Sequence, residues 1–277
     1  MDHTSLADRP IGIFDSGIGG LTVLRELHRQ LPAESTIYLG DTARVPYGMR
    51  SPETVKRYSM QNSMYLMEMG IKLLIIACNT SSAISLYSIR NMLDIPVLGV
   101  IEPGAKAAVA ATRNGAIGVI GTEVTIKSGA YRRAIHSHNG GVVVYEQCCP
   151  LFVPLVEEGW LNDDITEAVA RKYLKGLIRS GIDTLVLGCT HYPLLKDVIK
   201  KVMGSDIVLI DSGIEKAKNV KNILKDLNLL KRDNKDTFRK YYVTDSPDRF
   251  IDIGRRFLAE PMEDITSIEL TSLEMAI

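Results

Sequence analysis

Two segments of the chain share a pattern in which a short apolar run ends in a cysteine followed by a hydroxyl residue. The first is LLIIACNTSSA at residues 73–83, which contains Cys78, and the second is TLVLGCTHYPLL at residues 184–195, which contains Cys189. Each apolar run is too short for a helix and is typical of a buried strand in a parallel sheet. Ligands of open α/β sheets bind at the carboxyl ends of the strands. The sequence therefore predicts a thiol at such an edge in two places.

A second similarity indicates that the chain contains two related halves. The segments PIGIFDSG from Pro10 and AIGVIGTE from Ala116 both predict a short strand with an early glycine, followed by small polar residues. Each segment precedes its cysteine by a similar length of chain. We therefore predict an α/β fold of two similar, open, mostly parallel-sheet domains, related by pseudo-two-fold symmetry, with the active site in the cleft between them.

The order of the predicted strands and helices gives limits for the two domains. We expect residues 1–99 and 211–277 to form the first domain and residues 100–210 to form the second. A late strand at residues 241–243 and a final helix at residues 247–258 belong to the tail, which we expect to pack on the first domain.

Composition and charge exclude several classes of partner and site. The 33 Lys and Arg residues balance 33 Asp and Glu residues, so neither nucleic acid nor a membrane surface is expected as a partner. The lysines of residues 214–240 are interpreted as the solvated face of an amphipathic helix. No segment approaches the ~20 apolar residues of a membrane span, and residues 1–10 lack the apolar core of a signal peptide. The 4 cysteines include no C-x-x-C pair, so we expect a cytoplasmic protein with reduced thiols and no zinc site.

The matched pair of cysteines suggests a specific chemistry. A single cysteine after a strand is more often a small buried apolar residue, but two in equivalent positions of two halves favour a function. If the halves face each other, Cys78 and Cys189 reach one crevice from opposite sides. Each would lie at a helix N-terminus, which we expect to lower its pKa toward neutrality. One thiolate and one thiol on opposite faces of a carbon could remove a proton and return one with inversion.

Nearby residues could tune the two thiols or bind a small acid. Asp15 ends the first strand and His191 follows Cys189 by two positions, although either side chain could instead cap a helix. The turn GIGG at residues 17–20 lacks the full dinucleotide-binding motif, and its N–H groups could bind a carboxylate. Neutral donors that could bind a zwitterionic substrate are contributed by Ser16, Asn79, Thr80 and Thr190, and the loop at Tyr47 and Gly48 could close over it.

Several motifs together resemble one family. They are IGIFDSGIGGLTVLREL from Ile11, YLGDTARVPYG from Tyr38, ACNTSSA from Ala77, GVIEPG from Gly99, LGCTHYPLL from Leu187 and IDSG from Ile210. With these motifs the chain resembles the glutamate racemases of the cofactor-independent aspartate/glutamate racemase superfamily. The resemblance implies reversible interconversion of L- and D-glutamate, with D-glutamate supplied for bacterial peptidoglycan and hence cell-wall biogenesis and cell shape. It implies no cofactor, neither pyridoxal phosphate nor metal, and a homodimer.

The resemblance also implies roles for individual residues. Cys78 would act on the D-enantiomer with help from Asp15, and Cys189 would act on the L-enantiomer with help from His191. Glu157 is implied as a further acid near the site. The residues implied to contact substrate are Asp15, Ser16, Tyr47, Gly48, Asn79, Thr80, Thr190 and His191.

Three alternatives stay open at the level of sequence. A racemase for aspartate or another acidic amino acid would use the same residues. A two-lobed amino-acid-binding protein would share the fold but would have no use for paired thiols. A thiol redox protein would require the two sulfurs to approach within disulfide range, with Cα atoms less than ~7 Å apart.

Overall fold

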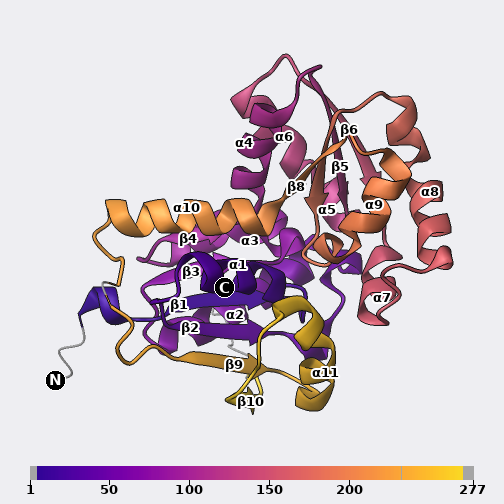
Figure 1. Ribbon diagram of the computed structural model, residues 1–277. Helices are drawn as coiled ribbons and strands as arrows, with labels where there is room; N and C mark the ends of the chain where they lie inside the picture. Colours follow the sequence, from indigo (N-terminus) through magenta and orange to yellow (C-terminus); the bar gives the residue numbers. More distant parts are fainter. Residues whose placement is uncertain (1–4, 232, 271–277) are drawn as a thin grey trace.

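The computed structural model describes residues 5–231 and 233–270, and its strands form two separate sheets. The first sheet has the strand order β10-β9-β2-β1-β3-β4 and the second the order β6-β5-β7-β8. Every pairing within them is parallel. In both sheets the first strand of the half lies between its second and third strands, so the two halves share one topology. The α/β fold with two similar parallel sheets is therefore as predicted (Figure 1).

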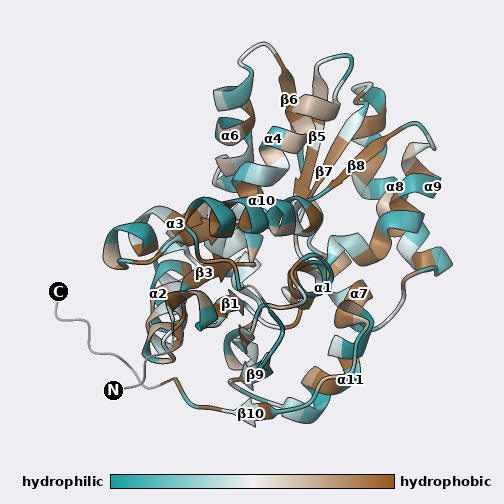
Figure 2. Cartoon of the chain, turned by 60° about the vertical axis from the view of Figure 1, so that its left-hand side comes forward, coloured by the Kyte–Doolittle hydropathy of each residue, from teal (hydrophilic) through white to brown (hydrophobic). Residues whose placement is uncertain are grey.

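The strands of the first sheet are short and most are fully buried. Their bounds are β1 Ile11–Asp15, β2 Thr36–Gly40, β3 Leu73–Ile76, β4 Val97–Gly99, β9 Arg239–Val243 and β10 Ile265–Ser267. The strands of the second sheet are β5 Ala116–Gly121, β6 Val143–Cys148, β7 Thr184–Gly188 and β8 Val208–Asp211. Strands covered on both faces carry continuous apolar runs rather than an alternating pattern. In Figure 2 the central strands of both sheets are accordingly brown, whereas β9 and β10 are paler and the helices carry teal segments.

Helices cover both sheets. Those of the first half and its tail are α1 Leu21–Gln30, α2 Pro52–Glu68, α3 Asn79–Met92 and α11 Pro247–Leu258. Helix α4 Ile101–Ala111 packs on the second half, whose other helices are α5 Glu123–Lys127, α6 Ala130–His138, α7 Phe152–Glu157, α8 Asp164–Arg179 and α9 Lys196–Met203, followed by α10 Ser212–Asp226. Ser51 caps α2 by accepting a hydrogen bond from the Thr54 N–H at 3.2 Å, and Pro52 begins the helix, as its sequence predicts.

The chain crosses between the halves twice, at α4 and at α10. Helix α10 runs from the end of β8 across the top of the first sheet in Figure 1 and packs on α1 and α4. Asp211 caps α10 through the N–H groups of Gly213 and Ile214. The helix ends at Asp226, well short of residue 240, and Lys216 on it is buried rather than solvated.

The tail returns to the first sheet. Strand β9 pairs with β2, β10 pairs with β9, and α11 packs on α1. The sheets therefore separate the chain close to the expected limits, while 1–99 with 211–277 and 100–210 stay predictions as domain limits. Residues 1–4 and 271–277 of the first domain lie outside the described residues. Among the residues that are described, no helix is long and apolar enough to cross a membrane.

Candidate active site

One cavity of about 420 Å³ lies at the carboxyl ends of strands from both sheets. Its volume suits a small-molecule ligand. The residues that line it follow β1, β2 and β3 in the first half and β5, β6 and β7 in the second. They include ten of the eleven residues singled out from the sequence, namely Ser16, Tyr47, Gly48, Cys78, Asn79, Thr80, Glu157, Cys189, Thr190 and His191.

Cys78 lies at the end of β3 and caps α3. Its Sγ accepts from the Ser81 N–H at 3.5 Å and lies 3.6 Å from the Ser16 hydroxyl. The thiol is buried, and burial together with the negative charge of Asp15 raises its pKa to about 11. The expectation of a lowered pKa was therefore wrong for Cys78, because loss of hydration and a nearby carboxylate outweigh the helix N-terminus.

Asp15 is the one predicted residue that does not line the cavity. It ends β1 and is fully buried, and its Oδ2 accepts from the Gly17 N–H at 2.9 Å. Its Oδ1 has no hydrogen-bond partner among the described residues. Burial raises the pKa of Asp15, although the positive charge of His191 opposes that rise. Asp15 is thus close enough to both Cys78 and His191 for their charges to interact.

A chain of three side chains connects Cys189 to an acid. The Cys189 Sγ lies 3.8 Å from Nδ1 of His191, and Nε2 of His191 lies 3.0 Å from Oε1 of Glu157. Burial disfavours the imidazolium, but the hydrogen bonds with Cys189 and Glu157 outweigh it and raise the pKa of His191 to about 10. The ring of Phe257, on α11, packs edge-on against His191 with centroids 5.2 Å apart. His191 is therefore held as a cation beside the thiol.

A polar network positions the loop that carries Tyr47 and Gly48. The Tyr47 hydroxyl donates to Asp41 and accepts from Asn62 at 3.1 Å. Arg44 donates from Nε to both Asp41 oxygens, at 2.9 and 2.7 Å. Gly48 lies so close to Thr122 of the other half that a Cβ would come within 2.6 Å of it. Asp41 and Arg44 were not singled out from the sequence, because only the fold brings them to this loop.

Neutral donors and acceptors from both halves surround the two thiols. Thr80 lies 3.0 Å from the Thr122 hydroxyl across the cleft. The Asn79 Oδ1 accepts from the Tyr131 hydroxyl at 2.6 Å, while the Asn79 Nδ2 is buried without a partner among the described residues. The Thr190 carbonyl accepts from Thr22 at 2.9 Å, which connects the two halves beside Cys189.

Sequence reasoning missed part of the cavity wall. Thr122 and Glu123 line it directly after β5, in the position that Ser16 and Gly17 occupy after β1. The similarity of AIGVIGTE to PIGIFDSG was the signal that could have identified them. The apolar part of the wall is formed by Ile18, Val45, Pro46, Met49, Pro150, Leu151, Val153 and Pro154. These residues carry no chemical motif, so only the structure assigns them.

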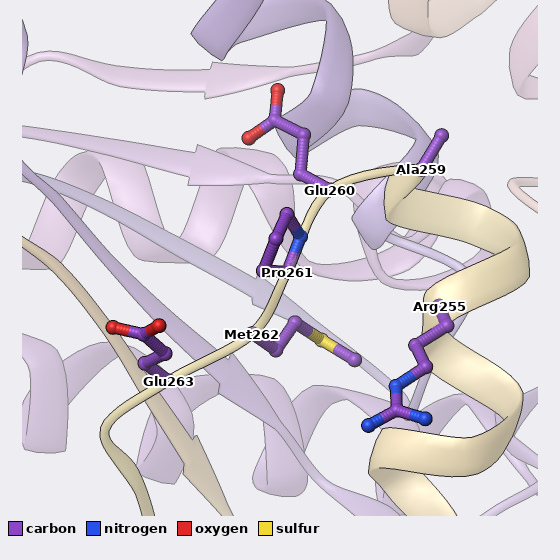
Figure 3. Close-up of a pocket in the computed structure, with 6 residues that line it drawn as sticks. All are labelled: Arg255, Ala259, Glu260, Pro261, Met262 and Glu263. Carbon is purple, nitrogen blue, oxygen red and sulfur yellow. The ribbon is translucent and has the colours of Figure 1, made fainter.

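A second hollow, of about 560 Å³, lies away from both thiols (Figure 3). It is lined by Arg255 on α11 and residues 259–263 of the segment that follows. Glu260 there pairs with His28 and Arg239. All lining residues come from one short stretch of chain, whereas the thiol cavity brings together six strand ends. The thiol cavity is therefore the better candidate for an active site.

The thiol cavity provides acid–base groups rather than metal ligands. Cys78 and Cys189 are both free thiols, each beside a buried charged group. Within residues 5–231 and 233–270, no group of three or more His, Cys, Asp or Glu side chains is placed to hold a metal ion. Two thiols from separate sheets, each with its own titratable neighbour, can exchange protons with one bound ligand.

Known proteins with similar sequences and structures support an enzyme. A family model described as Asp/Glu/Hydantoin racemase matches residues 11–218. The chain is 53% identical over 262 residues to a glutamate racemase of Geobacter metallireducens. This match covers 95% of the present chain and 97% of the relative. The chain is 50% identical over 263 residues to a glutamate racemase of Neisseria meningitidis, with the same coverage of 95% and 97%.

Among solved structures, the glutamate racemase of Francisella tularensis in complex with D-glutamate matches with a TM-score of 0.91 at 40% identity. The match covers 96% of this chain and 99% of that one. The chain therefore belongs to the Asp/Glu/Hydantoin racemase family and is an enzyme of the isomerase class, with glutamate racemases as its relatives.

Proposed function

We propose that the protein interconverts L- and D-glutamate by a two-base proton transfer in which Cys78 and Cys189 are the bases. The observation that carries the proposal is that both thiols, delivered by separate sheets, line one cavity of ligand size. A binding protein would not need two thiols there, each beside a charged group, and a redox protein would need the two sulfurs within disulfide range. The substrate assignment is supported by the relatives, which are glutamate racemases, one of them in complex with D-glutamate.

In the proposed reaction, the Cys189 thiolate takes the α-proton of L-glutamate and becomes a thiol. The electron pair of the broken C–H bond is shared with the substrate carboxylate, whose added charge Asn79, Thr80 and Thr190 would stabilise by donating hydrogen bonds. The Cys78 thiol then gives its proton to the opposite face of the carbon, which yields D-glutamate and a Cys78 thiolate. The reverse reaction exchanges the two roles.

The charged neighbours fit these roles. The His191 cation, held by Glu157, stabilises the Cys189 thiolate. Cys78 has a raised pKa in the ligand-free protein, which favours the thiol that donates a proton. The α-ammonium group of a bound substrate would place a positive charge near Cys78 and lower its pKa when it must act as base. Asp15 would balance that ammonium charge.

Deuterium exchange tests the proposal. Purified protein is incubated in D2O with L-glutamate or with L-aspartate, and the α-proton signal and optical rotation are followed. With glutamate, we expect the α-proton signal and the optical rotation to disappear. Exchange with aspartate but not with glutamate would reject the substrate assignment. Cys78→Ser and Cys189→Ser should each abolish racemisation, whereas Cys148→Ser, a change outside the cavity, should leave it intact. Bound glutamate without exchange would favour a two-lobed binding protein.

The proposal extends to the cellular role. D-glutamate made in the cytoplasm would supply peptidoglycan synthesis, and the enzyme would act as a homodimer. Depletion of the protein in its host should cause cell-wall lysis that added D-glutamate relieves. Sedimentation equilibrium would measure the oligomeric state.

A further inference from the structure

Tyr131 contacts the neighbours of both thiols, although it lies outside the cavity lining. It is buried in α6 of the second half, and its hydroxyl donates to the Asn79 Oδ1 at 2.6 Å. Asn79 directly follows Cys78. The ring of Tyr131 lies against Gly188, where a Cβ would come 3.0 Å from Cε2, and Gly188 directly precedes Cys189. One side chain thus spans the two strand ends that carry the thiols.

Fixed surroundings hold Tyr131 in place. A Cβ at Gly104, in α4, would come 3.6 Å from the Tyr131 ring, so the helix backbone packs against that ring. Ser212, at the start of α10, lies against the same glycine, since that Cβ would also come 3.5 Å from the Ser212 Cβ. These contacts come from the two segments where the chain crosses between the halves. The position of the hydroxyl is therefore set by the frame of the molecule rather than by a loop.

The hydrogen bond from Tyr131 decides which side of the Asn79 amide faces the ligand. With Oδ1 occupied by Tyr131, the amino group is the part left for another partner. Asn79 is only 3% exposed and lines the cavity, and its Nδ2 has no partner among the described residues. A buried N–H group without an acceptor is unfavourable, and a ligand oxygen that accepts from it would remove that penalty.

We infer that Tyr131 is a positioning residue that fixes the Asn79 amide so that its Nδ2 donates to a carboxylate oxygen of the substrate. Without the hydroxyl the amide could rotate and present its carbonyl oxygen to an anion, which would repel it. The inference rests on the proposed function, because that function supplies the carboxylate.

Steady-state kinetics of Tyr131→Phe in the full chain, with L- and D-glutamate, test the inference. We expect KM to rise about 10-fold for both enantiomers, because one aligned hydrogen bond to the charged substrate is lost. We expect kcat to change less than about 3-fold. Tyr192→Phe is the matched control, since it also loses a buried hydrogen bond, to the Cys149 carbonyl at 2.8 Å, which does not reach the cavity. Its KM should stay unchanged.

A double-mutant cycle separates positioning from a general structural effect. If Tyr131 acts through Asn79, Tyr131→Phe should add no further rise in KM to Asn79→Ala. Asn79→Asp keeps an acceptor for Tyr131 but removes the donor, so its KM should rise at least as much as that of Tyr131→Phe. This variant tests the inference even if Tyr131→Phe does not fold.

The outcomes separate this inference from the proposed function. Turnover of glutamate by the wild type, with an unchanged KM in Tyr131→Phe or Asn79→Asp, would overturn the inference alone. A rise in KM that persists in the Asn79→Ala background would also overturn it. Absence of turnover by the wild type would overturn the proposed function and the inference together.

Discussion

Replacing Glu157 with glutamine tests the charge relationship at Cys189 with almost no change of shape. The substitution keeps a hydrogen-bond partner for His191 Nε2 but removes the carboxylate charge 3.0 Å away. The His191 side chain is 8% exposed and that of Glu157 26%, so solvent screens the pair only in part. A charge-assisted hydrogen bond in such a place is worth about 1.5–2 kcal/mol more than its neutral counterpart.

That energy predicts a change in both pKa and rate. At about 1.4 kcal/mol for each pKa unit, the pKa of His191 should fall by roughly 1–1.5 units from its value of about 10. A weaker imidazolium stabilises the Cys189 thiolate less, so kcat/KM should fall about 10-fold. Because the two enantiomers are equally stable in water, kcat/KM must fall equally in both directions. This equality gives the assay an internal check.

The same change predicts how stability depends on pH. The pKa of His191 is about 10 in the folded protein, against an ordinary value of 6.5. Between these two pH values the folded protein therefore keeps a proton on His191 that the unfolded chain releases. The resulting stabilisation is complete below pH 6.5 and is lost as pH rises through about 10. Glu157→Gln should therefore lower Tm by roughly 3–6 °C near neutral pH, and the difference should shrink as pH approaches 10.

Glu158→Gln is the matched control, since it removes the same charge from an exposed neighbour on the same helix end. Thermal melts and initial rates are measured for wild type and both variants between pH 6 and 10.5. If Glu157→Gln behaves like Glu158→Gln in both assays, the reasoning on the Cys189–His191–Glu157 chain is refuted.

Three further predictions concern stability and, in the last of them, substrate affinity. Gly188→Ala should destabilise the protein by several kcal/mol in urea unfolding, because the new Cβ would meet the Ile120 carbonyl oxygen at 2.6 Å. Gly176→Ala should instead stabilise it by about 0.5–1 kcal/mol, because Gly176 lies inside α8 and a Cβ there would meet nothing within 4 Å. Lys72→Met should cost about 3–5 kcal/mol, because it leaves the Glu34 carboxylate buried without its cation; a loss below about 1 kcal/mol would contradict this. Asp41→Asn should lower Tm and raise the KM for glutamate about 10-fold, because it weakens the bonds that hold the Tyr47 loop; an unchanged KM would show that the loop needs no such support.

Much of the fold followed from local patterns. The apolar runs before Cys78 and Cys189 became β3 and β7, and the final helix matches residues 247–258. These features depend on periodicity and caps, which neighbouring residues determine. The lysine-rich segment was less well predicted, because Lys216 is buried in a helix that packs on α1 and α4, which are distant in sequence.

The site was predictable where strand ends carried unusual residues. Ten of the predicted residues line one cavity, but Asp41 and Tyr131, which position Tyr47 and Asn79, were not found. Both act through contacts between elements that lie far apart in the chain. The raised pKa of Cys78 could not be predicted either, because it depends on how completely the fold excludes water.

The fate of the α-proton in a single turnover tests the two-base proposal most directly. L-glutamate is supplied in D2O, and the earliest D-glutamate formed and the remaining L-glutamate are analysed by mass spectrometry. If Cys189 removes the proton and Cys78 donates one from its own thiol, the first D-glutamate carries deuterium in nearly every molecule, while the remaining L-glutamate keeps its proton. D-glutamate that retains the substrate's own proton would show that a single base serves both faces, and would contradict the account.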